Sequence, residues 1–138
     1  MAQLTAPTVC KHHADAVLAQ AAAVQNTWYT ILDTAANIRI YQITALIVTA
    51  GETIAIKITI DGNVLTATQA QDADAVYYWG LDADASDALQ AVKATQTAPT
   101  ISGYLEGKSV KVEMRKTTAA GANTLTGRVK YGVVEGGK

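Results

Sequence analysis

Hydrophobic and polar residues alternate most regularly over residues 54–60, where isoleucine occupies every second position. Successive side chains of a strand point to opposite faces, so this spacing places one continuous apolar ridge on one face. The stretch runs directly into Asp61-Gly62, which is a strong hairpin signal. We expect Lys57 and Thr59 to face outward. The residues predicted to face the core are Ile54, Ile56, Ile58 and Ile60.

Segments of similar pattern recur along the chain and predict strands at residues 28–32, 38–49, 52–60, 64–68, 75–81, 100–105, 109–116 and 125–134. Roughly eight strands at this spacing are typical of sandwiches and barrels. Residues 82–99 are predicted to form a loop with one helical turn around residues 87–92. The resulting prediction is an all-β, single jelly-roll-like antiparallel β-sandwich. An immunoglobulin-like sandwich is the alternative, although paired cysteines are missing.

The N-terminal part follows a different pattern. Residues 1–12 have no periodicity and predict an extended arm. From His13 onward, apolar residues recur at spacings of three and four, which predicts a short helix. This helix is marginal alone in water and needs a surface to lie on. The predicted organisation is an arm and helix over residues 1–26, followed by a β-sandwich domain over residues 27–138. The apolar helix positions are Ala14, Val17, Ala21 and Val24.

The composition limits the classes of partner. Charged residues make up 17% of the chain and the formal net charge is -1, so electrostatic attraction to nucleic acid or an anionic membrane is weak. No apolar run approaches the ~18 residues of a membrane span. The first residues also lack the basic and apolar regions of a secretory signal peptide. We therefore predict neither a nucleic-acid nor a membrane partner.

Residues that carry out chemistry at neutral pH are sparse. His12, His13 and the single cysteine, Cys10, precede the first predicted strand, so the β body lacks the usual nucleophiles, bases and metal ligands. Adjacent histidines point in different directions and are poorly placed to share a metal ion. Phosphate-binding loops, nucleophile elbows and zinc-protease motifs are absent from the sequence. The chain is predicted not to be an enzyme, with no catalytic residue, cofactor or metal site.

Aspartates cluster between residues 72 and 87. Asp82, Asp84 and Ser86 match the first alternating oxygen ligands of an EF-hand, but Asp87 and Lys93 stand where glycine and a bidentate glutamate are required. A solvated acidic loop is the preferred interpretation. An irregular calcium site is the alternative.

Three consecutive aromatic residues, Tyr77, Tyr78 and Trp79, fall within one predicted strand. Tyr77 and Trp79 would share one face and Tyr78 the other. Exposed aromatic residues on a β-sandwich are how carbohydrate-binding modules stack sugar rings, which makes these three the candidate ligand-facing aromatics. In the alternative interpretation Trp79 closes the core, because large aromatic residues dominate core energetics.

Four segments, in their order along the chain, resemble those of a known class of proteins. These are the segments 26–33 (NTWYTILD), 37–41 (NIRIY), 51–62 (GETIAIKITIDG) and 110–114 (VKVEM). Together they resemble small jelly-roll proteins of tailed-phage and related virus particles, over residues 26–135. Proteins of that kind decorate capsids, form turrets or head fibres, or carry receptor-binding tips, commonly as trimers.

The resemblance implies a virion structural protein at the capsid surface, forming a trimer and anchored to a capsid or other virion protein through the segment before Asn26. The arm is short and not strongly basic, so contact with the genome is not expected. A self-assembling single-jelly-roll shell or tube subunit, and a carbohydrate-binding module, are the alternatives. The residues expected to serve assembly and anchoring are Leu4, Val9, Val17, Leu18, Ala21 and Val24.

Overall fold

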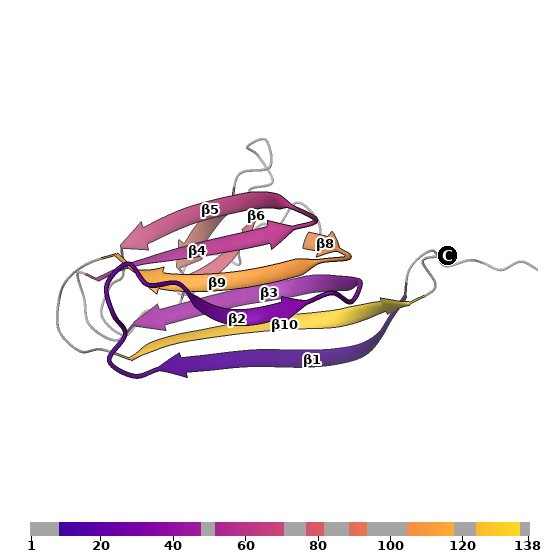
Figure 1. The fold of residues 1–138 in the computed structure, drawn as a ribbon, viewed down its shortest axis with the longest axis horizontal. Helices are drawn as coiled ribbons and strands as arrows, with labels where there is room; N and C mark the ends of the chain where they lie inside the picture. The colour runs from indigo at the N-terminus through magenta and orange to yellow at the C-terminus, as the bar shows by residue number, and fades with distance from the viewer. Residues whose placement is uncertain are drawn as a thin grey trace, which may run out of the picture.

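The computed structural model describes residues 9–47, 52–70, 77–81, 89–93, 105–117 and 124–135, and in these ranges the chain forms ten strands and no helix (Figure 1). The predicted all-β class is confirmed. The strands are β1 (Val9–Gln20), β2 (Tyr29–Thr34), β3 (Ile38–Ile47), β4 (Thr53–Ile60), β5 (Asn63–Ala70), β6 (Tyr77–Leu81), β7 (Leu89–Lys93), β8 (Leu105–Gly107), β9 (Val110–Lys116) and β10 (Leu125–Glu135).

The strands form two antiparallel sheets that pack face to face as a sandwich. The larger, six-stranded sheet has the order β1-β10-β3-β6-β7, with β8 also paired to β3. β6 and β8 pair with different parts of β3, around Thr44 and Arg39 respectively. The smaller, four-stranded sheet has the order β2-β9-β4-β5. The end strands of the smaller sheet are therefore β2 and β5.

The core lies between the two sheets, and the isoleucine ridge of β4 is at its centre. Ile54, Ile56 and Ile58 are each 0% exposed, while Lys57 and Thr59 on the opposite face are partly exposed. Ile60 is partly buried and packs against the same core. The predicted inward face of β4 is thus confirmed. The larger sheet contributes mainly Ile38, Ile40, Ile43, Trp79, Leu125 and Val129.

The predicted hairpin is also confirmed, since β4 and β5 pair from Thr53↔Ala70 to Ile60↔Asn63. Asp61 and Gly62 have φ angles of 49° and 89°, the left-handed conformation that a two-residue hairpin turn requires. The Asp61 carboxylate also accepts hydrogen bonds of 2.9 Å from the backbone N–H groups of Lys108 and Ser109. The turn is therefore tied to the connection between β8 and β9.

The helix predicted from His13 is wrong. Residues 13–20 belong to β1, as do residues 9–12 of the predicted arm, and β1 pairs with β10 from Val9↔Glu135 to Gln20↔Leu125. Alanine occupies two of the four apolar positions that predict a helix and has the highest intrinsic helix propensity, so the local sequence favours a helix. Backbone hydrogen bonds along the length of β10 decide the outcome, because tertiary context overrides local propensity.

The predicted loop over residues 82–99 needs a second correction. Leu89–Lys93 forms β7, which pairs antiparallel with β6 from Tyr77↔Lys93 to Leu81↔Leu89. The helical turn predicted there is therefore wrong for residues 89–92. In the strand predicted at 100–105, Leu105 belongs to β8 and residues 100–104 lie outside the described residues.

Candidate assembly surface

β1 is an edge strand. It has one neighbour in the larger sheet, β10, and no strand of the described residues pairs with its other edge. Figure 1 shows β1 along the lower border of the molecule, parallel to the sandwich's long axis. An edge strand presents a row of backbone N–H and C=O groups that a second chain can pair with. β1 has 12 residues, which makes this edge long.

The two faces of β1 differ in burial. Asp15, Val17 and Ala19 are exposed on the outer face, and Val17 retains 53% of its accessible surface. Ala16 and Leu18 point inward and pack against the core, but both are only partly buried. The facing sheet ends at β2, so it covers the border strand incompletely. Apolar surface therefore remains accessible on both faces of β1.

A tight turn after β1 holds a second exposed valine. Ala23 is 4% exposed and belongs to the core, whereas its neighbour Val24 is 60% exposed. The Val24 N–H donates to the Tyr29 hydroxyl at 2.9 Å, and the Asn26 N–H donates to the Lys116 carbonyl at 2.8 Å. Val24 is thus presented by a backbone that is fixed on both sides.

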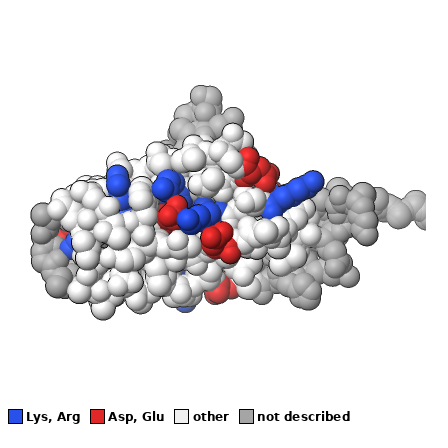
Figure 2. All heavy atoms as spheres, in the orientation of Figure 1, with Lys and Arg blue, Asp and Glu red and all other residues white. Residues whose placement is uncertain are grey.

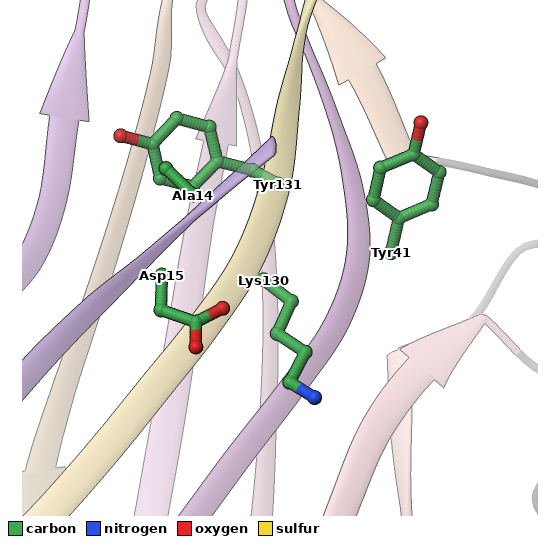
Figure 3. A pocket seen from close by; sticks show the side chains of 5 residues that line it. All are labelled: Ala14, Asp15, Tyr41, Lys130 and Tyr131. Atoms are coloured by element: carbon green, nitrogen blue, oxygen red, sulfur yellow. The ribbon is translucent and has the colours of Figure 1, made fainter. Parts of the chain in front are cut away.

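A shallow hollow borders this edge on the larger sheet, with a volume of about 340 Å³ (Figure 3). Asp15 and Lys130 are register partners on β1 and β10. Tyr41 is the extra residue of a bulge, because Lys130 pairs with Gln42 and Tyr131 pairs with Ile40. Figure 3 shows the Tyr131 and Tyr41 rings apart from each other in the upper half of the view, with Ala14 beside the Tyr131 ring and the Asp15 and Lys130 side chains below them. The hollow is lined by one carboxylate, one ammonium group, two tyrosines and an alanine.

Charged side chains on the smaller sheet engage one another. Figure 2 shows acidic and basic groups gathered in a band across a mostly uncharged face. Lys57 Nζ and Arg115 Cζ each lie 4.4 Å from the centre of the Trp28 ring. The Glu113 carboxylate forms ion pairs with Lys57 at 3.4 Å and with Lys111 at 3.6 Å. Trp28 is therefore held by cations of its own chain.

Trp79 does not face a ligand, so that part of the aromatic prediction is wrong. It is 2% exposed and belongs to the core, as the alternative interpretation expected. Its indole Nε1 is buried without a hydrogen-bond partner. Tyr77 and Tyr78 lie in β6, and their side chains lie outside the described residues.

The anchoring residues predicted from the sequence are dispersed by the strand. Val17, Ala21 and Val24 are exposed and Leu18 is partly buried, so they do not share one helical face. Val9 starts β1, and its side chain, like all of Leu4, lies outside the described residues. The sequence analysis missed the edge itself. A weak signal for it was present in the alternation of inward Ala16 and Leu18 with outward Asp15, Val17 and Ala19.

The described residues were also compared with the requirements of a metal site and of a membrane-spanning helix. Among the described residues, no three His, Cys, Asp or Glu side chains gather closely enough to hold a metal ion. The aspartates of the calcium alternative at 72–87 lie outside those residues. No helix with the length and hydropathy of a membrane span occurs in the described ranges.

No known family matches the sequence, and no curated protein matches it either. The fold is similar to that of a chain in the acidic stable capsid structure of Helicobacter pylori bacteriophage KHP30. The TM-score is 0.50 at 11% sequence identity, and the alignment covers 92% of this chain and 94% of that chain. At this identity the likeness concerns the fold, and it extends over nearly the whole of both chains.

Proposed function

We propose that the protein is a structural component of a virus particle, of the kind that decorates the capsid of a tailed phage. The observation that carries this proposal is the similarity to a phage capsid chain, which covers 92% of this chain and 94% of the other. A match over the whole of both chains indicates a shared architecture and not one common motif. Two observations support the function: this structural similarity and the resemblance of the sequence to small jelly-roll virion proteins.

The proposal includes a jelly-roll topology for the sandwich. The pairing of the strands supports it, because β1 pairs with β10, β2 with β9, β3 with β6 and β4 with β5. These pairs are nested one inside the next, as in a single long hairpin that has been rolled up. β7 and β8 lie between β6 and β9 in the chain and are additions to this scheme.

We further propose a homo-oligomer, with a trimer as its form, attached at the capsid surface through the N-terminal side of the molecule. The accessible apolar residue Val24, 60% exposed on the turn after β1, supports this orientation. An exposed valine on a turn fixed by backbone hydrogen bonds loses little conformational entropy when a partner covers it. The residues before β1, including Leu4, would extend the same contact.

Deletion of the gene from the virus that encodes the chain tests the proposal. We expect intact shells that lack this protein, and we expect the purified recombinant protein to rebind them. Failure to form any shell would favour the alternative of a shell or tube subunit. Absence of the protein from normal purified particles would overturn the proposal altogether.

A further inference from the structure

Lys11 lies near the start of β1, but from residue 14 to residue 20 this edge has little of the usual protection against strand pairing. Natural edge strands carry charges, prolines or bulges that block a second chain. The bulge of β1 lies near its start, between Cys10 and His12, and Asp15 is the single charge between residues 14 and 20. The edge strand β2 is better protected, since it has 6 residues, a bulge after Thr30 and an exposed Asp33.

The segment 14–20 is complementary to itself. Suppose that two copies pair antiparallel and that their outer faces lie on the same side of the joined sheet. Each residue must then oppose a residue of the same face, so the two-fold axis lies between the two copies of one residue, which oppose each other. An axis at Asp15 would oppose two carboxylates, which is unfavourable. An axis at Val17 opposes Val17 to its own copy and Asp15 to Ala19. This register buries the exposed valine and opposes no like charges.

The same register also improves packing on the inner face. It places Leu18 of one copy opposite Ala16 of the other, and both residues are only partly buried in the single chain. Val17, 53% exposed, meets its counterpart on the outer face. Apolar surface is therefore removed from water on both sides of the joined strands. One register of self-pairing thus covers apolar side chains on the outer and the inner face together. We therefore assign a second copy of this chain as the partner.

We propose that neighbouring copies of this chain pair through β1, antiparallel, about a two-fold axis at Val17. This inference rests on the proposed assembly of the protein at the capsid surface. A two-fold contact cannot itself close a ring of three, so it would join one trimer to the next. The larger sheet would then run without interruption from one copy into its neighbour.

Sedimentation over a range of concentrations tests the contact. We expect trimers that associate further as concentration rises, and we expect Val17→Lys to weaken this second step at least about tenfold, because an edge lysine blocks strand pairing. Val64→Lys is the matched control, since Val64 is 57% exposed on the other sheet's edge strand, β5. It should leave both steps unchanged.

The possible outcomes separate this inference from the proposed function. Trimers at every concentration, unaffected by Val17→Lys, would overturn the β1 contact and leave the trimer standing. Monomers and dimers sensitive to Val17→Lys would support the contact and overturn the trimer. Monomers alone would overturn both. An effect of Val64→Lys in place of Val17→Lys would assign the contact to β5 and overturn the inference.

Cysteine cross-linking tests the register. In a Cys10→Ser background, Val17→Cys should form a covalent dimer on mild oxidation, because directly opposed residues have Cα atoms about 4.5–5.5 Å apart, within disulfide reach. Asp15→Cys and Ala19→Cys should each fail to cross-link alone and should cross-link when mixed. Cross-linking of Ala19→Cys with itself, or none by Val17→Cys, would overturn the proposed axis.

Discussion

At the scale of single residues, Ile58 shows what the alternating pattern determines. It is 0% exposed in the middle of β4, and its two neighbours along the strand are partly exposed. Its position in the core follows from period two alone, since a slip of one residue would expose the whole ridge. The size of the cavity it fills depends on facing residues of the other sheet and could not be read from the sequence.

Replacement of Ile58 by Asp should lower the free energy of unfolding by about 3–5 kcal/mol, because a carboxylate would be buried without a partner. Ile58→Val, which keeps the chain folded, should cost about 0.5–1.5 kcal/mol. Thr59→Asp on the outward face is the control, with an expected change within about 0.5 kcal/mol. Urea unfolding measures all three, and equal stability of Ile58→Asp and the parent would refute the inward assignment.

Trp28 illustrates a contact that the sequence did not reveal. Lys57 lies 4.4 Å from its ring centre although 29 residues separate them in the chain. We expect a coupling free energy of about 0.5–1 kcal/mol between the two side chains, the usual strength of a cation over an indole at a partly exposed site. A double-mutant cycle with Trp28→Leu and Lys57→Met measures it by urea unfolding. Strict additivity would show that the ring and the ammonium group do not interact.

At the scale of elements, the sequence predicts best where one pattern dominates. β4, β9 and β10 alternate clearly and appear at nearly the predicted bounds. The residues of β1 also fit the helical period, so their pattern predicts a helix. The five residues of β7, flanked by aspartates and threonines, carry too little pattern to predict a strand. For the candidate assembly surface, the sequence therefore predicts some of the residues and not the edge strand that carries them. An edge exists only once the order of strands is known.

The hairpin between β4 and β5 yields a prediction at this scale. Asp61 has a left-handed φ of 49° and accepts two backbone hydrogen bonds from the β8–β9 connection. Asp61→Ala should destabilise by about 1–3 kcal/mol, since it loses both bonds and tolerates that φ poorly. Asp61→Asn keeps an acceptor oxygen, and asparagine also tolerates a positive φ, so this variant should lose clearly less free energy of unfolding. Thermal unfolding that ranks the alanine variant equal to the asparagine variant would contradict this account of the turn.

At the scale of the whole molecule, nested pairing of distant strands is the main property of the fold. β1 and β10 lie at opposite ends of the described chain and pair along the full length of β1. No local pattern contains that information, because the pairing is decided by which arrangement closes both sheets over one core. The predicted sandwich is confirmed as a class, whereas the sheet order and the exposed edge came from the structure.

The proposed function requires this chain to be a stoichiometric part of a virus particle. Quantification of its peptides against labelled standards, in gradient-purified particles of a virus whose genome carries its gene, measures this most directly. We predict a fixed ratio to the main shell subunit across the particle peak, and loss of the protein from the peak only under conditions that strip the capsid surface. A protein that is absent from the peak, or whose ratio varies from fraction to fraction, would contradict the account.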